Sequence, residues 1–500
     1  MVIEAMESPH FLSALIVVPL LAMIVGWMVR SAQQAFLLGI IAATVELALS
    51  IWLLTAFHAE SAEMQFAERI PFTSFLSFHV GVDGVSILFV VLTALLTLLV
   101  ILYGEIVDES PAGLYVSSVF AYQAVLMGLF LSIDVLEFWV VSALELIPGL
   151  FILHRWGVGR DKYKAIKRYG VNMAGALAML LAAVLMVGWH HAQAAGAWSF
   201  ALADLLDTPL DPSRQSLAFI LFFYALSLRM AHFPFHAWLP VVAENGPLAT
   251  LCVFLVGLKV GIYALLRFVL PLFPDAAHEW KFFVVGIAVF GIFYAALLAL
   301  MQINLRRLLA FSAVSQTGML VIGVFCLNRE GLQGSLLLGI NFGVAASALL
   351  FVTGVLQRST HTTYLPRLGG MFDSLPLLGL TFLLAAFSTM AMPGTPGFDA
   401  AHLILEGAIE THNWGVAVAM ASGSVASAAF LLWAFQRVFL AQRRDASLRP
   451  EKIRLSLSEA VLVGALCVVQ LGVGFYTEPW LEIVDDSLSK LANKLDNRTP

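Results

Sequence analysis

The chain has 500 residues, of which 60% are hydrophobic and 12% are charged, and its formal net charge is −6. A soluble globular protein carries about 25% charged residues, so the composition excludes a soluble enzyme. Nothing in the sequence indicates nucleic-acid binding. Cys252, Cys326 and Cys467 lie far apart inside apolar stretches, which indicates neither a disulfide framework nor a metal site. We therefore expect a membrane protein without a metal.

Apolar runs of 20 or so residues follow one another along the chain, and each is long enough to cross about 30 Å of hydrocarbon. About 14 spans are predicted, at 11–30, 35–57, 82–104, 113–133, 134–153, 170–190, 216–235, 247–270, 281–301, 307–326, 333–356, 374–392, 414–436 and 457–477. They are expected to be helices because an open sheet would leave unpaired backbone groups in lipid. Segment 396–406 is too short to span, so we expect it to continue the twelfth helix after a break. The first run has no cleavage pattern and is read as a retained helix.

Basic residues gather in alternate loops, which predicts the orientation of the chain. They are Arg155, Arg160, Lys162, Lys164, Lys167 and Arg168 after span five, Arg306 and Arg307 before span ten, Arg358 and Arg367 after span eleven, and Arg437, Arg443, Arg444, Arg449, Lys452 and Arg454 after span thirteen. The positive-inside rule places loop 155–168 in the cytoplasm and both termini outside it. The loop at 105–112 carries Glu105, Asp108 and Glu109 instead, but acidic residues weigh little in the rule. The prediction is a multi-pass protein of the bacterial inner membrane.

Two of the spans are interrupted. Span seven runs into His232, Pro234 and His236, and span twelve ends in Met-Pro-Gly-Thr-Pro-Gly at 392–397. Proline removes a backbone donor and breaks a helix, and such a break survives at membrane depth only where protein or a water-filled cavity covers it. The two breaks lie five spans apart, as an internal repeat would place them. Broken helices at matching positions in two halves indicate an ion pathway near the bilayer midplane.

Lys259 lies deep inside an otherwise apolar helix. A charge there costs about 3 kcal/mol on insertion scales. Burial pushes a lysine towards neutrality and a nearby carboxylate pushes it back, so a lysine poised between the two can accept and release protons. The alternative is a lysine that extends to the membrane surface, which its central place argues against.

Two carboxylates lie in span five. Glu145, beside Pro148, is the best partner in the sequence for a buried cation, although it could instead serve helix packing. Glu137 is nearer the helix start, where the helix dipole would stabilise a carboxylate without any role in transport.

The other candidates flank the breaks. Arg229 keeps its proton and so favours an electrostatic role over conduction. His232 and His236 either switch protonation near neutral pH or bond freed carbonyls at the helix end. Asp399 and His402 either form an acid–base pair at i, i+3 or cap the short helix that follows. The eight candidates for a proton or ion path are thus Lys259, Glu145, Arg229, His236, His232, Glu137, Asp399 and His402.

No motif for nucleotide, dinucleotide or iron–sulfur binding is present. We expect no cofactor and no redox or hydrolytic site in this chain, so the energy for uphill pumping would have to come from a partner.

Several motifs resemble the proton-conducting antiporter-like subunits of respiratory complex I, above all the subunit M type of NADH–quinone oxidoreductase. They occur in order over about residues 65–440: Gly-Val-Asp-Gly at 81–84, His-Ala-Trp-Leu-Pro at 236–240, Leu-Lys-Val-Gly-Ile-Tyr at 258–263, Leu-Arg-Phe at 266–268, Gly-Gly-Met at 369–371 and Pro-Gly-Thr-Pro-Gly-Phe at 393–398. The resemblance implies 14 helices, with two inverted five-helix repeats and broken seventh and twelfth helices. It also places Lys259 on the central proton-relay lysine of the family and Arg229 where the family has a lysine.

The chain departs from this family at other positions. The glutamate position of the fifth helix reads Ala143, with Glu145 two residues further on. Two residues rotate by about 200° around a helix, so Glu145 should face another way unless the helix is re-registered. The titratable positions of the second half are occupied by other residues: Asn304, Gln316, Phe342 and Ala401.

Three functions remain open. The chain is a proton- or cation-translocating membrane subunit of a complex I-like assembly, beside other membrane subunits and a large cytoplasmic or peripheral module. Alternatively, it serves an inorganic-carbon (bicarbonate or CO₂) uptake complex with a carbonic-anhydrase-like partner, or it is a non-conducting scaffold. The expected divisions are residues 1–112 for helices one to three, 113–271 for the first antiporter-like half, 272–440 for the second, and 441–500 for the last span and a tail.

Overall fold

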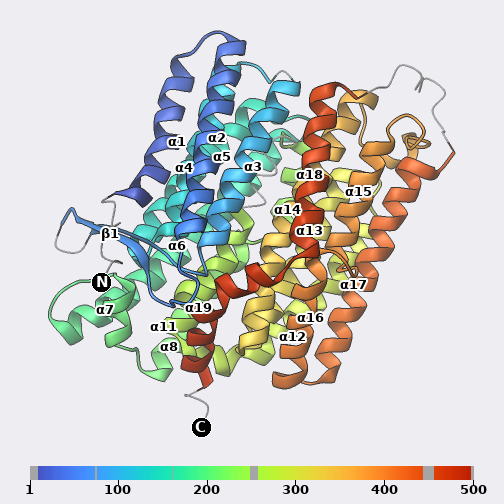
Figure 1. Ribbon diagram of the computed structural model, residues 1–500. Helices are drawn as coiled ribbons and strands as arrows, with labels where there is room; N and C mark the ends of the chain where they lie inside the picture. Colours follow the sequence, from blue (N-terminus) through green and yellow to red (C-terminus); the bar gives the residue numbers. More distant parts are fainter. Residues whose placement is uncertain are drawn as a thin grey trace.

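A computed structural model describes residues 10–73, 76–107, 109–159, 161–247, 257–442 and 455–496. Asp108, Arg160, Cys252, the start of span eight and the basic residues Arg443, Arg444, Arg449, Lys452 and Arg454 lie outside the described residues. The molecule is a bundle of long helices (Figure 1). Eleven described helices are long and apolar enough to cross a membrane.

The uninterrupted spans closely follow the predicted ranges. They are α1 Phe11–Met28, α2 Ala32–Ala56, α3 Ile87–Val107, α4 Ala112–Leu131, α5 Val135–Trp156, α6 Lys162–Ala195, α12 Pro274–Leu300, α13 Leu305–Val324, α14 Arg329–Thr360, α17 Trp414–Phe435 continued by η4 Gln436–Leu440, and α18 Leu457–Phe475. Three further spans are interrupted or partly described: α8 Pro212–Arg229 with α9 Leu239–Asn245, the helix over 257–272, and α15 Pro376–Thr389 with α16 Pro396–Thr411. Together they confirm the all-α polytopic fold with about 14 membrane helices.

Shorter elements join these spans. They are α7 Leu202–Asp207, the 3₁₀ turns η1 Phe235–Trp238 and η3 Leu365–Arg367, and, in the helix over 257–272, the π-helix η2 Leu265–Val269 and α11 Leu270–Leu272. A last helix, α19 Glu478–Asp496, stands where only a tail was expected.

A small hairpin was not predicted. Strand β1 (Gln65–Pro71) pairs with β2 (Ser77–Val82) in antiparallel register between spans two and three. The third span therefore begins at Ile87 instead of at residue 82. The strands are polar and short, and the hydropathy pattern reads them as a loop.

Matching local structures mark the two halves of the bundle. Asp134 precedes α5 and forms an antiparallel bridge with Ala201; Asn304 precedes α13 and bridges to Tyr364. In both places the side chain accepts a hydrogen bond from the first turn of the helix that follows. Spans five and ten cross the membrane in opposite directions, so the repeats are inverted.

The two breaks share one backbone conformation. Arg229-Met230-Ala231 ends α8 and Thr389-Met390-Ala391 ends α15. The two alanines have φ of 52° and 59°. The next residue bonds back in each case, from His232 N to Ser227 O at 2.9 Å and from Met392 N to Phe387 O at 3.0 Å. Each helix therefore ends in a Schellman motif, and the helix breaks, like the N-caps, repeat between the halves.

Candidate functional site

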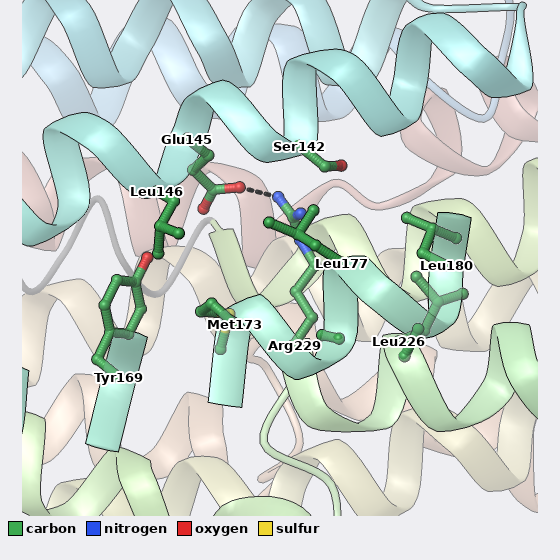
Figure 2. Close-up of a pocket in the computed structure, with 11 residues that line it drawn as sticks. Ser142, Glu145, Leu146, Tyr169, Met173, Leu177, Leu180, Leu226 and Arg229 are labelled. Carbon is green, nitrogen blue, oxygen red and sulfur yellow. Dashed lines mark hydrogen bonds and ion pairs between the residues drawn. The ribbon is translucent and has the colours of Figure 1, made fainter. Parts of the chain in front are cut away.

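A buried ion pair lies where α5 faces the end of α8. The carboxylate of Glu145 accepts a hydrogen bond from the Arg229 guanidinium, as Figure 2 shows. The Tyr122 hydroxyl of α4 donates to the other carboxylate oxygen at 2.5 Å. Glu145 is 7% exposed and Arg229 8% exposed. Charge-assisted partners on both oxygens make this a tightly held carboxylate.

This geometry corrects one expectation. Glu145 does not face away from the centre, although it stands two residues beyond the glutamate position of the family. Arg229 has replaced a lysine, and its side chain reaches Glu145 directly (Figure 2). The planar fork of arginine can meet a carboxylate from directions that a lysine cannot.

A small cavity lies against the pair. Its volume is about 20 Å³, and its lining includes Glu145, Arg229 and Ser142 among apolar side chains of α6. Such a volume is large enough for one water molecule. The Ser142 hydroxyl is buried without a partner among the described residues, so the cavity offers a polar step beside the ion pair.

Lys259 lies next to this region on the eighth span. Gly257, two residues earlier, is so close that an added Cβ would be 3.0 Å from Glu145 Oε1 and 2.8 Å from Tyr122 Oη. Lys259 is 1% exposed. Its ammonium lies 4.2 Å from the centroid of the Phe342 ring, and no carboxylate in the described part of the chain forms an ion pair with it.

Phe342 is the residue that stands where the resemblance implies a histidine. A ring beneath a buried cation contributes about 2 kcal/mol when the contact is desolvated. Phe342 also lines a second cavity of about 20 Å³, together with Ser312 and Arg306. The Ser312 hydroxyl has no partner among the described residues. Lys259 thus lies between a cavity at Phe342 and the Glu145 region.

Arg306 closes the far end of the broken seventh helix. Its guanidinium donates to Ala243 O at 2.7 Å and to Gly246 O. It therefore satisfies carbonyls that α9 leaves without helical partners at its end. The sequence presented Arg306 only as a basic loop residue, yet it is 3% exposed and structural.

The histidines of span seven do not bond the freed carbonyls. Trp238 Nε1 donates to Leu228 O at 2.9 Å, and the Thr317 hydroxyl lies 3.4 Å from Met230 O. Neither ring nitrogen of His232, nor Nδ1 of His236, has a partner in the described part of the chain. Both rings pack on aromatic side chains instead, His232 on Phe223 and His236 on Phe233.

The remaining candidates lie outside the centre. Glu137 is in the first turn of α5, where the helix dipole stabilises a carboxylate. It accepts a hydrogen bond from His79 N of β2 at 3.0 Å. Asp399 accepts from the Thr477 hydroxyl at 2.5 Å. His402 is exposed, and no ion pair joins it to Asp399 among the described residues. Of the two alternatives for Asp399 and His402, the acid–base pair is therefore not formed among the described residues.

The equivalent positions of the second half are neutral. Counted from the two N-caps, Glu145 corresponds to Ser315; counted from the two breaks, Arg229 corresponds to Thr389. The span that holds Lys259 and the matching span of the second half each contain a π-helix, η2 and η4. Counted back from the starts of these π-helices, Lys259 corresponds to Phe430.

Amide side chains close the second break. Gln316 Nε2 donates to Thr389 O at 3.0 Å, and Asn341 Nδ2 donates to Ser388 O at 3.2 Å. The Ser388 hydroxyl donates back to Asn341 Oδ1 at 2.6 Å. Charge thus gathers in the first half, whereas hydrogen-bonded amides fill the second.

Two sequence motifs meet in a second buried pair. The Arg267 guanidinium of Leu-Arg-Phe binds both carboxylate oxygens of Asp83 from Gly-Val-Asp-Gly, with Nη1 to Oδ2 at 2.8 Å. Both are buried, at 6% and 4% exposure. This pair was not predicted as a contact, since nothing in the linear spacing brings 83 to 267.

The arrangement defines a class: a polytopic membrane protein built from two inverted repeats with a charged centre at the broken seventh helix. Comparison with known proteins gives the family. The profile described as "NADH:quinone oxidoreductase/Mrp antiporter, TM" matches residues 132–427. The chain belongs to this family of antiporter-like membrane subunits, and it is a multi-pass protein of the inner membrane.

Individual relatives agree over almost the whole length. NADH-ubiquinone oxidoreductase chain 4 of Marchantia polymorpha is 32% identical over 492 residues, covering 96% of both chains. NADH-quinone oxidoreductase subunit M of Rhodobacter capsulatus is 30% identical over 92% of this chain and 90% of its own. A chain of respiratory complex I from Thermus thermophilus superposes with a TM-score of 0.88 at 25% identity, over 97% of this chain and 99% of that one. A chain of the Mrp complex from Dietzia shares the fold, with a TM-score of 0.87 at 20% identity, over 97% and 98%.

Proposed function

We propose that the chain translocates protons, or another small cation, through its first half, as a membrane subunit of a complex I-like assembly. One observation carries the proposal: the buried Glu145–Arg229 pair and Lys259 stand in the first half, whereas Ser315, Thr389 and Phe430 stand at the matching places of the second. Charges held deep in lipid-embedded helices are costly, which is why they indicate a transport role.

The chemistry of the centre suits proton transfer. Lys259 has no carboxylate partner among the described residues, so its charge is held only by the Phe342 ring and its surroundings. The ammonium can give up its proton at small electrostatic cost and regain it. Arg229 stays charged, and it is held by the Glu145 carboxylate beside the path.

The energy source belongs to a partner. The solved relatives are chains of respiratory complex I and of the Mrp complex. We propose that neighbouring membrane subunits and a peripheral module drive the flow through this chain. Purification of the assembly with identification of the accompanying subunits tests this: a large zinc protein would favour the inorganic-carbon alternative, and a set of redox subunits would favour the complex I-like one.

The test of conduction is Lys259→Ala in the purified assembly, reconstituted into liposomes. We expect proton flux to fall at least tenfold, because the buried titratable ammonium of the first half is lost. The matched control is Phe430→Leu, at the equivalent place in the second half, which should leave flux within about twofold. Unchanged flux and unchanged partner activity in Lys259→Ala would instead support the scaffold alternative.

A further inference from the structure

A further buried carboxylate lies in the N-terminal helices, outside the antiporter-like halves. Glu46 is near the middle of α2 and is 0% exposed. Neither of its carboxylate oxygens has a hydrogen-bond partner among the described residues. Gln123 of α4 is also 0% exposed, and neither its amide nitrogen nor its amide oxygen has a partner there. Buried polar groups without partners are rare and call for an explanation.

The two side chains lie at one level on neighbouring helices. Gly39 of α2 packs on Val116 of α4, where an added Cβ would be 3.1 Å from a methyl group of Val116. The helices α2 and α4 run in the same direction, since α3 lies between them in the chain. Glu46 and Gln123 each lie seven residues further along, which is two turns on the same face. The carboxyl and the amide therefore share the seam between the two helices.

No cation faces Glu46 from the helices packed on α2, within the residues described. Helix α1 has no ionisable side chain, and those of α3 and α4 are Tyr103, Glu105, Tyr115 and Tyr122. Glu105 is exposed. Tyr115 donates to Val100 O at 3.2 Å and Tyr122 to Glu145. Tyr103 lies against Gly354 of α14.

A charged carboxylate without a partner is costly in hydrocarbon. A carboxyl that has bound a proton is neutral, and it can both donate to and accept from a glutamine amide. We propose that Glu46 is a proton-binding site of the N-terminal helices, which exchanges its proton with water and is held opposite Gln123. Tyr122 and Gln123 are consecutive in α4. Tyr122 donates to Glu145, and Gln123 faces the seam that holds Glu46. The site does not rest on the proposed function, because it requires no flux through Lys259.

The first test is infrared spectroscopy of the whole assembly in lipid as pH is varied. A protonated carboxyl in apolar surroundings has a carbonyl stretching band of its own. We expect a band that titrates, that is absent in Glu46→Gln, and that shifts in frequency in Gln123→Leu. The matched control is Glu105→Gln on neighbouring α3, which should leave the band unchanged.

The second test is reaction with an apolar carbodiimide. It adds the O–H of a protonated carboxyl across one C=N bond to give an O-acylisourea, whose acyl group then moves from oxygen to nitrogen to leave a stable N-acylurea. We expect mass spectrometry to find the adduct on Glu46, with a yield that falls several-fold as pH rises. A yield and band that do not change with pH, or no adduct and no band assignable to Glu46, would overturn the proposal. If Lys259→Ala left flux unchanged while Glu46 still titrated, conduction would be disproved and this site would stand.

Discussion

At the scale of single residues, the buried charges of the first half are held in two different ways. Glu145 and Arg229 are paired and buried, and Tyr122 satisfies the second carboxylate oxygen. The Lys259 ammonium instead lies over the Phe342 ring. Under the proposed function the two have different roles: the pair sets the local field, and the lysine changes protonation.

The pair makes a prediction for stability. Glu145→Ala removes one partner and leaves Arg229 buried and uncompensated, which should cost about 3–5 kcal/mol. Glu145→Gln combined with Arg229→Gln removes both charges and should recover most of that loss. Thermal unfolding of the purified chain in detergent measures both variants. Equal destabilisation by the single and the double variant would show that the pair is not coupled.

Which of these residues the sequence could find depends on how each is marked. Lys259, Glu145 and Arg229 stand out because each charge interrupts an apolar run. Glu46 interrupts span two in the same way, but it lies away from the helix breaks and the family motifs and was not among the predicted site residues. Helix periodicity could not predict the contact of Glu145 with Arg229, because packing sets the direction of a long arginine side chain. Trp238 and Thr317, whose side chains bond the carbonyls freed at the first break, are not marked by any pattern in the sequence.

At the scale of elements, the two broken helices have the same backbone but different linings. Both end in a Schellman motif with alanine at the left-handed position. The first break has Arg229, His232 and His236 beside it, and the second is closed by Gln316 and Asn341. The proline and glycine motifs were enough to predict both breaks, while the pairing at the N-caps that reveals the repeat appears only in the fold.

The closed break gives a prediction that separates stability from transport. Asn341→Leu leaves the Ser388 carbonyl and hydroxyl without their partner, which should cost about 1–3 kcal/mol. Because Ser315, Thr389 and Phe430 stand at the second-half positions that match the charged ones, proton flux should stay within about twofold. Thermal unfolding and flux in liposomes measure the two effects. A tenfold loss of flux in a variant that remains folded would show that ions pass the second break.

At the scale of the whole molecule, α19 ties the C-terminal end to the rest of the bundle. Arg329 of α14 donates two hydrogen bonds to Asp485, at 2.7 and 2.6 Å. Gly84 N donates to the Ser487 hydroxyl, and an added Cβ at Gly84 would lie 3.1 Å from Val484 Cα. The glycine of the Gly-Val-Asp-Gly motif is thus explained by the close approach of α19, and the adjacent Asp83 binds Arg267 of the eighth span.

Acidification should loosen α19. The hydrogen bonds from Arg329 lower the pKa of Asp485 below its usual value. A depressed folded-state pKa contributes stability above the unfolded pKa of about 4, and that contribution is lost as pH falls through the folded value. We expect the protection factors of the α19 amides, which correct for the slower intrinsic exchange at low pH, to be smaller at pH 3 than at pH 6, and Asp485→Asn to abolish that difference. Equal protection factors at the two pH values would contradict this role of the pair.

The central claim is that ions pass through the first half and not the second, and the matched pair Arg229 and Thr389 tests it most directly. The measurement is proton flux into liposomes that contain the intact assembly, followed with an internal pH-sensitive dye, for Arg229→Leu and for Thr389→Leu. The account predicts at least a tenfold loss for Arg229→Leu and a change within about twofold for Thr389→Leu, with both assemblies intact. Equal losses in the two variants, or a loss only in Thr389→Leu, would contradict it.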